Sequence, residues 1–225
     1  PISVVTPATP TYATLPLPGS QPVLMDDKRN ESEGNQVVGS LCIKFPWPGI
    51  ARTIWGDHQR YIDTYFSSFP GKYFTGDGAL RDEVGYYRIT GRVDDVVIVS
   101  GHNLGTAPIE DAINEHPAVA ESAIVGFPHD IKGNALYGYV ILKESGESRD
   151  RDNLIKEINQ IITDHIGPIA RLDKIQFVTG LPKTRSGKIM RRILRKIAEG
   201  DFSNFGDTTT LLHPETVDEI KKNRL

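Results

Sequence analysis

The most informative stretch of the sequence is Lys183-Thr184-Arg185-Ser186-Gly187-Lys188, followed directly by Ile189-Met190-Arg191-Arg192-Ile193-Leu194-Arg195-Lys196-Ile197. Its first part predicts a flexible polar turn, because Gly and Ser interrupt regular structure. Its second part has isoleucine at positions 189, 193 and 197, a spacing that predicts an amphipathic helix. We therefore expect Lys188 at or just before the first helical turn. There, a mobile ammonium and the unpaired N–H groups of a helix end both favour a phosphate or a carboxylate.

Seven Lys or Arg residues fall between Lys183 and Lys196. Such a run has three interpretations: a solvated face, a patch that binds nucleic acid or membrane, or a loop that handles an anion. Composition alone favours the solvated face. The motifs elsewhere in the chain are needed to choose among the three.

Composition excludes several classes of protein. The 225 residues carry a formal net charge of −3, which argues against general nucleic-acid binding. One cysteine, Cys42, excludes a disulfide framework and a cysteine-based zinc site, and its apolar neighbours predict a buried thiol. No set of His, Cys, Asp and Glu has metal-site spacing.

No stretch approaches the roughly 20 apolar residues that span a membrane, and no signal peptide is present. We therefore expect a cytoplasmic protein that contacts neither nucleic acid nor membrane. The first residue is Pro1 rather than Met, so we expect a fragment or a processed piece.

The first half of the chain is expected to be rich in β-strands. Proline recurs through the first 34 residues and forbids a long helix there. The patterns predict one short helix at 57–69 and strands near 23–25, 37–45, 86–90 and 96–99. The segment 92–95 interrupts two strands and is the candidate domain boundary.

The second half alternates helices with short strands. Helices are predicted at 108–116 and 153–165, and strands at 122–127, 137–143 and 174–178. Thr106 is the expected N-cap of the first of these helices, and Pro108 fits its first turn. The fold class predicted for the whole chain is α+β, with a compact α+β unit from about residue 95 onward.

Three short motifs place polar groups beside glycine. Asp77 lies between Gly76 and Gly78, and a carboxylate exposed there can accept hydrogen bonds from ribose hydroxyls; the alternative is a plain Asx turn. Arg92 precedes two acids and can equally belong to a hairpin turn with surface charges. The glycine-rich segment 100–106 opens a helix and is similar to an anion or cofactor cradle, although its His102 alone is more often structural than catalytic.

The chain carries an ordered series of motifs: Trp47 to Thr53, Tyr73-Phe74-Thr75-Gly76-Asp77, Gly85-Tyr86-Tyr87, Ile89 to Asp95, Gly101 to Ala107, Ile131-Lys132-Gly133 and Pro182 to Lys196. Together, in this order, they resemble the carboxyl-terminal part of the acyl-adenylate-forming (AMP-binding) superfamily, and more closely its AMP-forming acetyl-CoA synthetase family. The resemblance extends from about Gln21 to about Gly206.

The resemblance implies a role for each matched residue. The Asp77 position binds the ribose hydroxyls of ATP or AMP, and the Arg92 position assists it. The Asp94 position is the hinge about which the carboxyl-terminal domain rotates between two half-reactions. After rotation, the Gly101 segment lines the channel for the coenzyme A arm.

The resemblance also implies that Lys188 is catalytic, because its ammonium offsets charge while a carboxylate attacks the α-phosphate. The same lysine is the position at which a lysine acetyltransferase and a deacetylase act in the family. ATP, Mg²⁺ and coenzyme A are the implied ligands, since Mg²⁺ offsets the charge of the phosphates.

Two matched positions depart from the family pattern. Acetyl-CoA synthetases usually carry arginine where this chain has Asn103, a position that contacts the nucleotide phosphate. The arginine that meets coenzyme A is replaced by Thr163. An uncharged side chain can donate hydrogen bonds at either position but supplies no charge.

The phosphate loop and the acyl-pocket motif that precede this region in the family are not in the sequence. We therefore expect residues 1–93 to be the β-rich end of the AMP-binding domain and residues 94–225 to be the mobile carboxyl-terminal domain. The implied function is the carboxyl-terminal portion of an acetate–CoA ligase, inactive alone. The alternatives are a ligase for another short acyl group, such as propionate or acetoacetate, and a non-enzymatic module that binds a partner through the basic helix.

Overall fold

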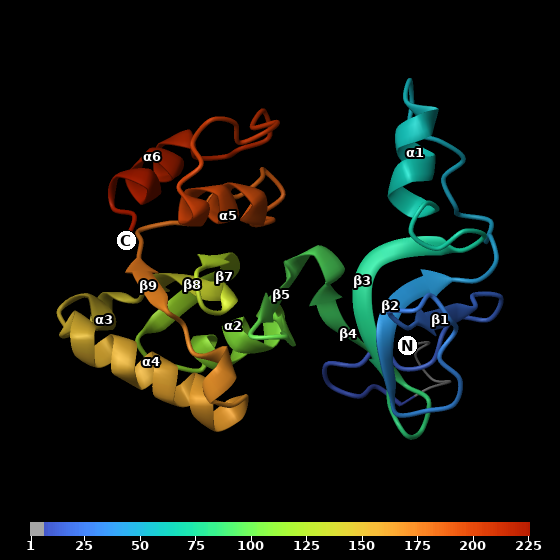
Figure 1. Ribbon diagram of the computed structural model, residues 1–225, viewed down its shortest axis with the longest axis horizontal. Coiled ribbons are helices and arrows are strands. Elements are labelled where there is room, and N and C mark those ends of the chain that lie inside the picture. Colours follow the sequence, from blue (N-terminus) through green and yellow to red (C-terminus); the bar gives the residue numbers. More distant parts are fainter. Residues whose placement is uncertain (1–6) are drawn as a thin grey trace. The chain divides into compact units, whose positions relative to one another are not determined.

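A computed structural model describes residues 7–225; Pro1 and the five residues after it lie outside the described part. The chain divides into two compact units, with unit 1 ending at Asp94 and unit 2 spanning Asp95–Leu225 (Figure 1). The division falls within the segment 92–95, inside a short 3₁₀ helix at Val93–Asp95. Each unit is described by itself below.

Unit 1 is an antiparallel sheet with one helix. Its strands follow the sheet in the order β1-β2-β3-β4, and Leu24, Ala79 and Tyr87 form a small core. Aromatic rings pack beside the sheet, where Tyr65 stacks on Tyr73 with centroids 4.8 Å apart. The elements are β1 (Pro22–Met25), β2 (Val37–Ile43), α1 (His58–Tyr65), β3 (Tyr73–Arg81) and β4 (Tyr87–Arg92).

The expectation of a buried thiol at Cys42 is confirmed. The side chain is inaccessible to solvent in β2. Burial disfavours the thiolate and raises the pKa of Cys42 to about 11. The thiol is therefore a packing group rather than a nucleophile.

Unit 2 is a mixed sheet in the order β6-β5-β8-β7, with β9 parallel to β8. Helices cover both faces. The strands are β5 (Val96–Val99), β6 (His102–Gly105), β7 (Val119–His129), β8 (Gly133–Leu142) and β9 (Lys174–Phe177). The helices are α2 (Thr106–Asn114), α3 (Glu144–Glu147), α4 (Arg151–His165), α5 (Arg191–Glu199) and α6 (Pro214–Lys222), with a 3₁₀ turn at Pro168–Ala170.

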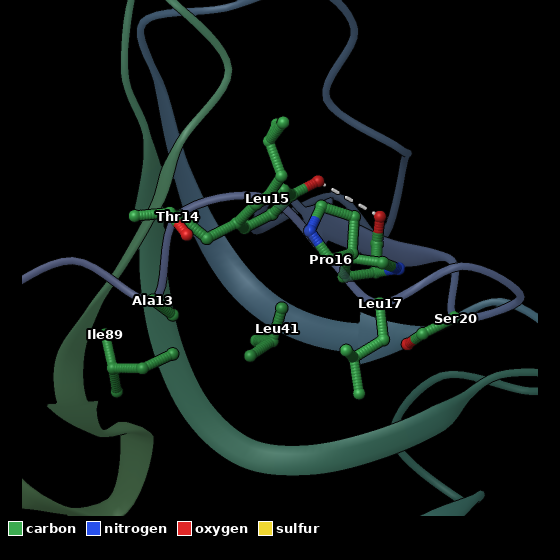
Figure 2. A pocket seen from close by; sticks show the side chains of 10 residues that line it. Ala13, Thr14, Leu15, Pro16, Leu17, Ser20, Leu41 and Ile89 are labelled. Carbon is green, nitrogen blue, oxygen red and sulfur yellow. Dashed lines mark hydrogen bonds between the residues drawn. The ribbon is translucent and has the colours of Figure 1, made fainter. Parts of the chain in front are cut away.

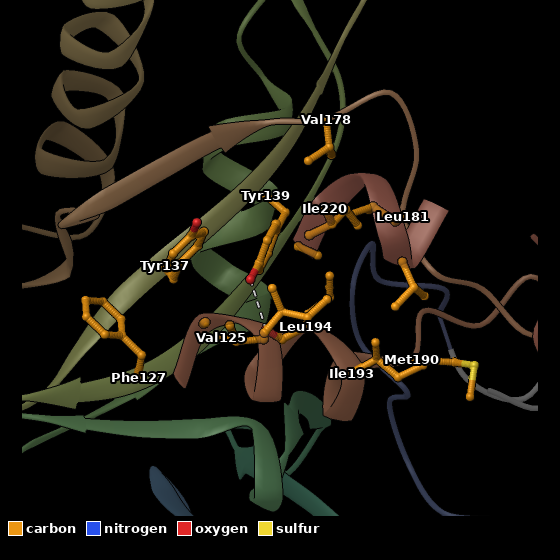
Figure 3. Packing of buried hydrophobic residues seen from close by; sticks show 14 of the residues in the cluster. Val125, Phe127, Tyr137, Tyr139, Val178, Leu181, Met190, Ile193, Leu194 and Ile220 are labelled. Atoms are coloured by element: carbon orange, nitrogen blue, oxygen red, sulfur yellow. Dashed lines mark hydrogen bonds between the residues drawn. The ribbon is translucent and has the colours of Figure 1, made fainter. Parts of the chain in front are cut away.

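Two hydrophobic cores lie on opposite faces of this sheet, because successive side chains of a strand point to opposite sides. On one face, the tyrosines of β8 and the apolar side of α5 pack together with α6 (Figure 3). Tyr139 donates a hydrogen bond to the carbonyl of Leu194, at 3.0 Å. On the other face, Ile124 and Leu136 pack against α2 and α4. The basic helix therefore has a buried side within unit 2.

The α+β prediction is confirmed, with corrections in detail. Thr106 is not the N-cap of α2: Gly105 holds that position without a side-chain bond, and Thr106 is buried inside the helix. The expected loop at 100–106 is a turn followed by strand β6. Ile189 lies before α5 and pairs with Lys183 in an isolated bridge. Helices α3 and α6 were not predicted.

We predict that Leu194→Ala lowers the free energy of unfolding of this chain by about 2–5 kcal/mol, because it leaves a cavity at a fully buried site. The measurement is urea unfolding followed by far-UV circular dichroism. Glu199→Ala, an exposed change on the same helix, is the control and should stay within about 0.5 kcal/mol of the unchanged chain. Equal effects of the two changes would contradict the packing described here.

Candidate functional site

Asp77 and Arg92 face each other across the β3–β4 pairing of unit 1. The Arg92 guanidinium lies 3.5 Å from Asp77 Oδ1, and its Nε donates to Asp94 Oδ1 at 3.0 Å. Arg92 also donates to the carbonyl of Thr75, at 3.3 Å. Asp77 lies within a strand, so the Asx-turn alternative is wrong. The structure thus gathers the predicted ribose residue, its assisting arginine and the predicted hinge residue around one guanidinium.

Gly76 makes room for that guanidinium. Its φ is +81°, and a Cβ built on it would lie 2.6 Å from an Arg92 terminal nitrogen. An L-residue here would be strained in its backbone and would push the guanidinium away from the Asp77 side of the strand. The observed position of the Arg92 guanidinium therefore requires glycine at residue 76.

The predicted coenzyme A segment is a tight hairpin between β5 and β6. Ser100 and Gly101 have φ values of +49° and +83°, the signature of a type I′ turn. Asn103 follows on β6, exposed, with its backbone opposite Ile98. A Cβ on Gly101 would meet no described atom within 4 Å, so within unit 2 the positive φ is what favours glycine there.

Thr163, the second departure from the family pattern, is occupied inside its own helix. Its hydroxyl donates to the carbonyl of Asn159 at 2.7 Å, one turn earlier in α4. The side chain is partly buried. The hydroxyl proton of Thr163 is therefore already donated within the helix, and this side chain adds no positive charge to the surface.

The loop that carries Lys188 is fixed at its base and exposed at its tip. The Thr184 and Lys188 backbones bond to each other at 2.8 Å, and the Thr184 hydroxyl accepts from the Lys188 N–H at 3.1 Å. The neighbouring chain adds bonds from Arg185 N–H to the Thr210 carbonyl and from Leu212 N–H to the Lys183 carbonyl. The expected flexible turn is therefore a braced one.

Lys183 and Lys188 behave differently although they are close in sequence. Lys183 Nζ lies 2.7 Å from Glu121 Oε2 on β7 and holds the base of the loop to the sheet. Lys188 is exposed, and within residues 7–225 no acidic side chain lies within ion-pair distance of its Nζ. Its ammonium remains available to an external anion.

A buried ion-pair cluster, which sequence reasoning missed, lies behind the loop. Glu110 on α2 accepts two bonds from the guanidinium of Arg191, at 2.6 and 2.7 Å. Arg191 and Arg195 also contact Asp95, at 3.2 and 3.5 Å. Burial raises the pKa of Glu110 above its usual value, and the neighbouring Arg191 opposes that rise. The sequence feature that could have indicated this cluster is the arginine at the start of α5, where acidic residues are normally preferred.

A mainly apolar hollow of about 240 Å³ lies in unit 1, between the segment 13–22 and the sheet (Figure 2). Leu15, Leu17, Leu41 and Ile89 line it. The hydroxyl of Thr14 is buried at its wall, and no atom of residues 7–225 forms a hydrogen bond with it. None of the predicted site residues is among those that line this hollow.

Within residues 7–225, no three His, Cys, Asp or Glu side chains are grouped so that they could hold a metal ion. None of the helices in that part of the chain has the length and apolar character needed to cross a membrane.

Residues 108–188 match the model of the AMP-binding enzyme C-terminal domain. The acetyl-coenzyme A synthetase of Brucella canis is 55% identical over 224 residues, covering 100% of this chain and 34% of that protein. The acetyl-coenzyme A synthetase of Parvibaculum lavamentivorans is 58% identical over 215 residues, covering 96% and 33%. This chain is homologous to acetyl-coenzyme A synthetases along its whole length.

The chain spans about a third of the length of these acetyl-coenzyme A synthetases. The anthranilate CoA ligase AuaEII, solved in complex with anthranoyl-AMP, is similar in structure, with a TM-score of 0.74 and 30% identity. That similarity covers 85% of this chain and 36% of the ligase. The α+β fold and the resemblance to acetyl-coenzyme A synthetases expected from the motifs are confirmed by these similarities.

We predict that Thr184→Ala speeds hydrogen exchange of the Lys188 amide by about 2- to 10-fold, because one hydrogen bond contributes about 0.5–1.5 kcal/mol. The amide is followed by NMR or by mass spectrometry of short peptides. Ser186→Ala is the control, since it removes a neighbour of the Thr184 hydroxyl but leaves that acceptor in place. Unchanged protection in Thr184→Ala would show that the loop is braced in some other way.

Proposed function

We propose that this chain is the carboxyl-terminal part of an acetate–CoA ligase that works through acetyl-adenylate. It supplies part of the nucleotide-binding site and the domain that carries the catalytic lysine, Lys188. The observation that carries the proposal is the exposed Lys188 on a braced loop, within a chain homologous to acetyl-coenzyme A synthetases. Under this proposal, residues 1–93 complete an AMP-binding domain and residues 94–225 move as the carboxyl-terminal domain.

In the first half-reaction, an acetate oxygen forms a bond to the α-phosphorus of ATP, and the bond to the β-phosphate oxygen breaks, releasing diphosphate. Both reactants are anions, so the Lys188 ammonium lowers the barrier by offsetting the charge where they meet. Asp77 holds the ribose hydroxyls by accepting hydrogen bonds, and Arg92, which lies 3.5 Å from Asp77 Oδ1, orients that carboxylate. Asn103 supplies a neutral donor near the phosphates.

In the second half-reaction, the sulfur of coenzyme A attacks the acetyl carbonyl carbon. The carbon–oxygen bond to AMP breaks, the thiol proton is released, and AMP leaves. Rotation at Asp94 replaces the loop of Lys188 by the hairpin of Gly101, beside which the pantetheine arm would pass. Mg²⁺ supplies charge neutralisation on the phosphates of ATP when it is bound.

The alternative of a binding module based on the basic helix is less well supported. Ile193, Leu194 and Ile197 are fully buried, and Arg191 and Arg195 are paired with acids. Two of the arginines that suggested a basic patch are thus paired with acidic side chains within unit 2. We further propose a cytoplasmic location, and a lysine acetyltransferase and a deacetylase as partners that act on the exposed Lys188.

We predict that Lys188→Ala, made in the full-length enzyme, lowers the adenylation rate by roughly 10²-fold or more, as the loss of an oxyanion donor does. Conversion of supplied acetyl-adenylate to acetyl-CoA should be spared. Acetylated Lys188, which has lost its charge, should behave in the same way. Diphosphate exchange measures the first step, and thioester formation from acetyl-adenylate measures the second.

Arg185→Ala serves as the control, because it removes a charge from the same exposed loop and should leave both steps within about twofold. Adenylation that survives in either Lys188→Ala or the acetylated enzyme would remove Lys188 from the catalytic role.

We predict that these 225 residues alone form no acetyl-CoA from ATP, acetate and coenzyme A. The chain covers about a third of its relatives, and the phosphate loop and the acyl pocket are not part of it. The assay follows acetyl-CoA by chromatography, with the full-length enzyme as the positive control. Turnover in the usual enzyme range, about 1–10³ per second, would contradict the proposed division of labour.

A further inference from the structure

Helix α5 begins with a charge of the unfavourable sign. Arg191 is its first residue, Arg192 its second, and no acidic residue lies in its first turn. The partial positive charge of a helix N-terminus disfavours cations there. A stable start to α5 therefore requires anions from other elements.

Two carboxylates meet this requirement, and both hold Arg191. Its terminal nitrogens donate to the two oxygens of Glu110, and its Nε faces Asp95 Oδ2 at 3.2 Å. The side chains of Glu110, Asp95 and Arg191 are 10%, 16% and 22% exposed. Planar bidentate pairing of this kind fixes direction as well as distance.

The carboxylates are themselves attached at separate places in unit 2. Glu110 Oε1 also accepts the N–H of Ile124 at 2.7 Å, which satisfies a donor on the outer edge of β7. Asp95 is the first residue of unit 2 and also contacts Arg195, one turn further along α5. The start of α5 is thus tied both to the sheet and to the residue that follows the proposed hinge.

The loop of Lys188 runs directly into this helix start, because only two residues lie between Lys188 and Arg191. We propose that Arg191 is a positioning residue for adenylation: held between Glu110 and Asp95, it sets the direction in which the Lys188 loop points from the hinge end of unit 2. The inference rests on the proposed role of Lys188. A misplacement of about 1 Å at a reacting group can cost about 10²-fold in rate, so a small rotation of α5 is sufficient to matter.

The test uses the full-length enzyme and its two half-reactions. Arg191→Met should lower adenylation by about 10-fold or more, while thioester formation from supplied acetyl-adenylate stays within about twofold, because that step does not use the lysine loop. Arg191→Lys should not rescue adenylation, since lysine keeps the charge but cannot form the planar bidentate pair. The matched control is Arg192→Met, the next and exposed arginine, which should leave both steps unchanged.

Equal losses in both half-reactions, an unaffected adenylation step, or full rescue by Arg191→Lys would each overturn the inference. If circular dichroism shows that Arg191→Met does not fold, the two half-reactions are measured in Asp95→Asn instead. That change removes one charge at nearly constant volume, and it should also lower adenylation more than thioester formation. Failure here is distinct from failure of the proposed function: an active Lys188→Ala enzyme overturns the latter. An impaired Lys188→Ala beside an unselective Arg191→Met overturns only the positioning role.

Discussion

The pairing of β7 with β8 is the constraint on which unit 2 depends. The two strands run antiparallel from Val119↔Leu142 to His129↔Gly133, and helices pack on both of their faces. A shift of one residue in this register would exchange the side chains of the two cores. Both the tyrosine face that receives α5 and the isoleucine face that receives α2 and α4 therefore require the same alignment. The position of the Lys188 loop follows from this alignment, because Glu121 of β7 holds its base.

Much of the fold could be predicted from periodicity, and the errors have physical causes. The strands at 119–129 and 133–142 were predicted too short. Their first residues include polar side chains such as Glu121 and Asn134, which do not show the apolar pattern of a strand although they are paired in the sheet. The hairpin at Ser100 has the composition of a loop, since glycine and polar residues are typical of both structures and only the partner strand distinguishes them. Helix α6 was missed because just Val217 and Ile220 are buried in it, too few to show a helical period.

The candidate site was predictable where residues are near in sequence or belong to a motif. Asp77, Arg92 and Asp94 were chosen from motifs, and the structure brings them together through strand pairing. The buried cluster of Glu110 with Arg191 was not predicted, because the partners are 81 positions apart in the sequence and no local pattern connects them. Its only local trace is a positive charge at a helix start. Long-range ion pairs of this kind depend on tertiary packing, which a single sequence does not display.

The bracing of the Lys188 loop limits how the ammonium can travel. Backbone hydrogen bonds join the loop to itself and to the segment 210–212. Rotation of the Lys188 side chain breaks none of these bonds and therefore needs little energy. Such rotation takes picoseconds to nanoseconds and spans a few ångströms. Under the proposed rotation at Asp94, a longer excursion of Lys188 is a displacement of unit 2 as a body, and motions of that kind take microseconds to milliseconds. Under that proposal the loop separates two timescales: fast side-chain rotation adjusts the ammonium on its anion, and slow domain motion brings the ammonium to the site or removes it.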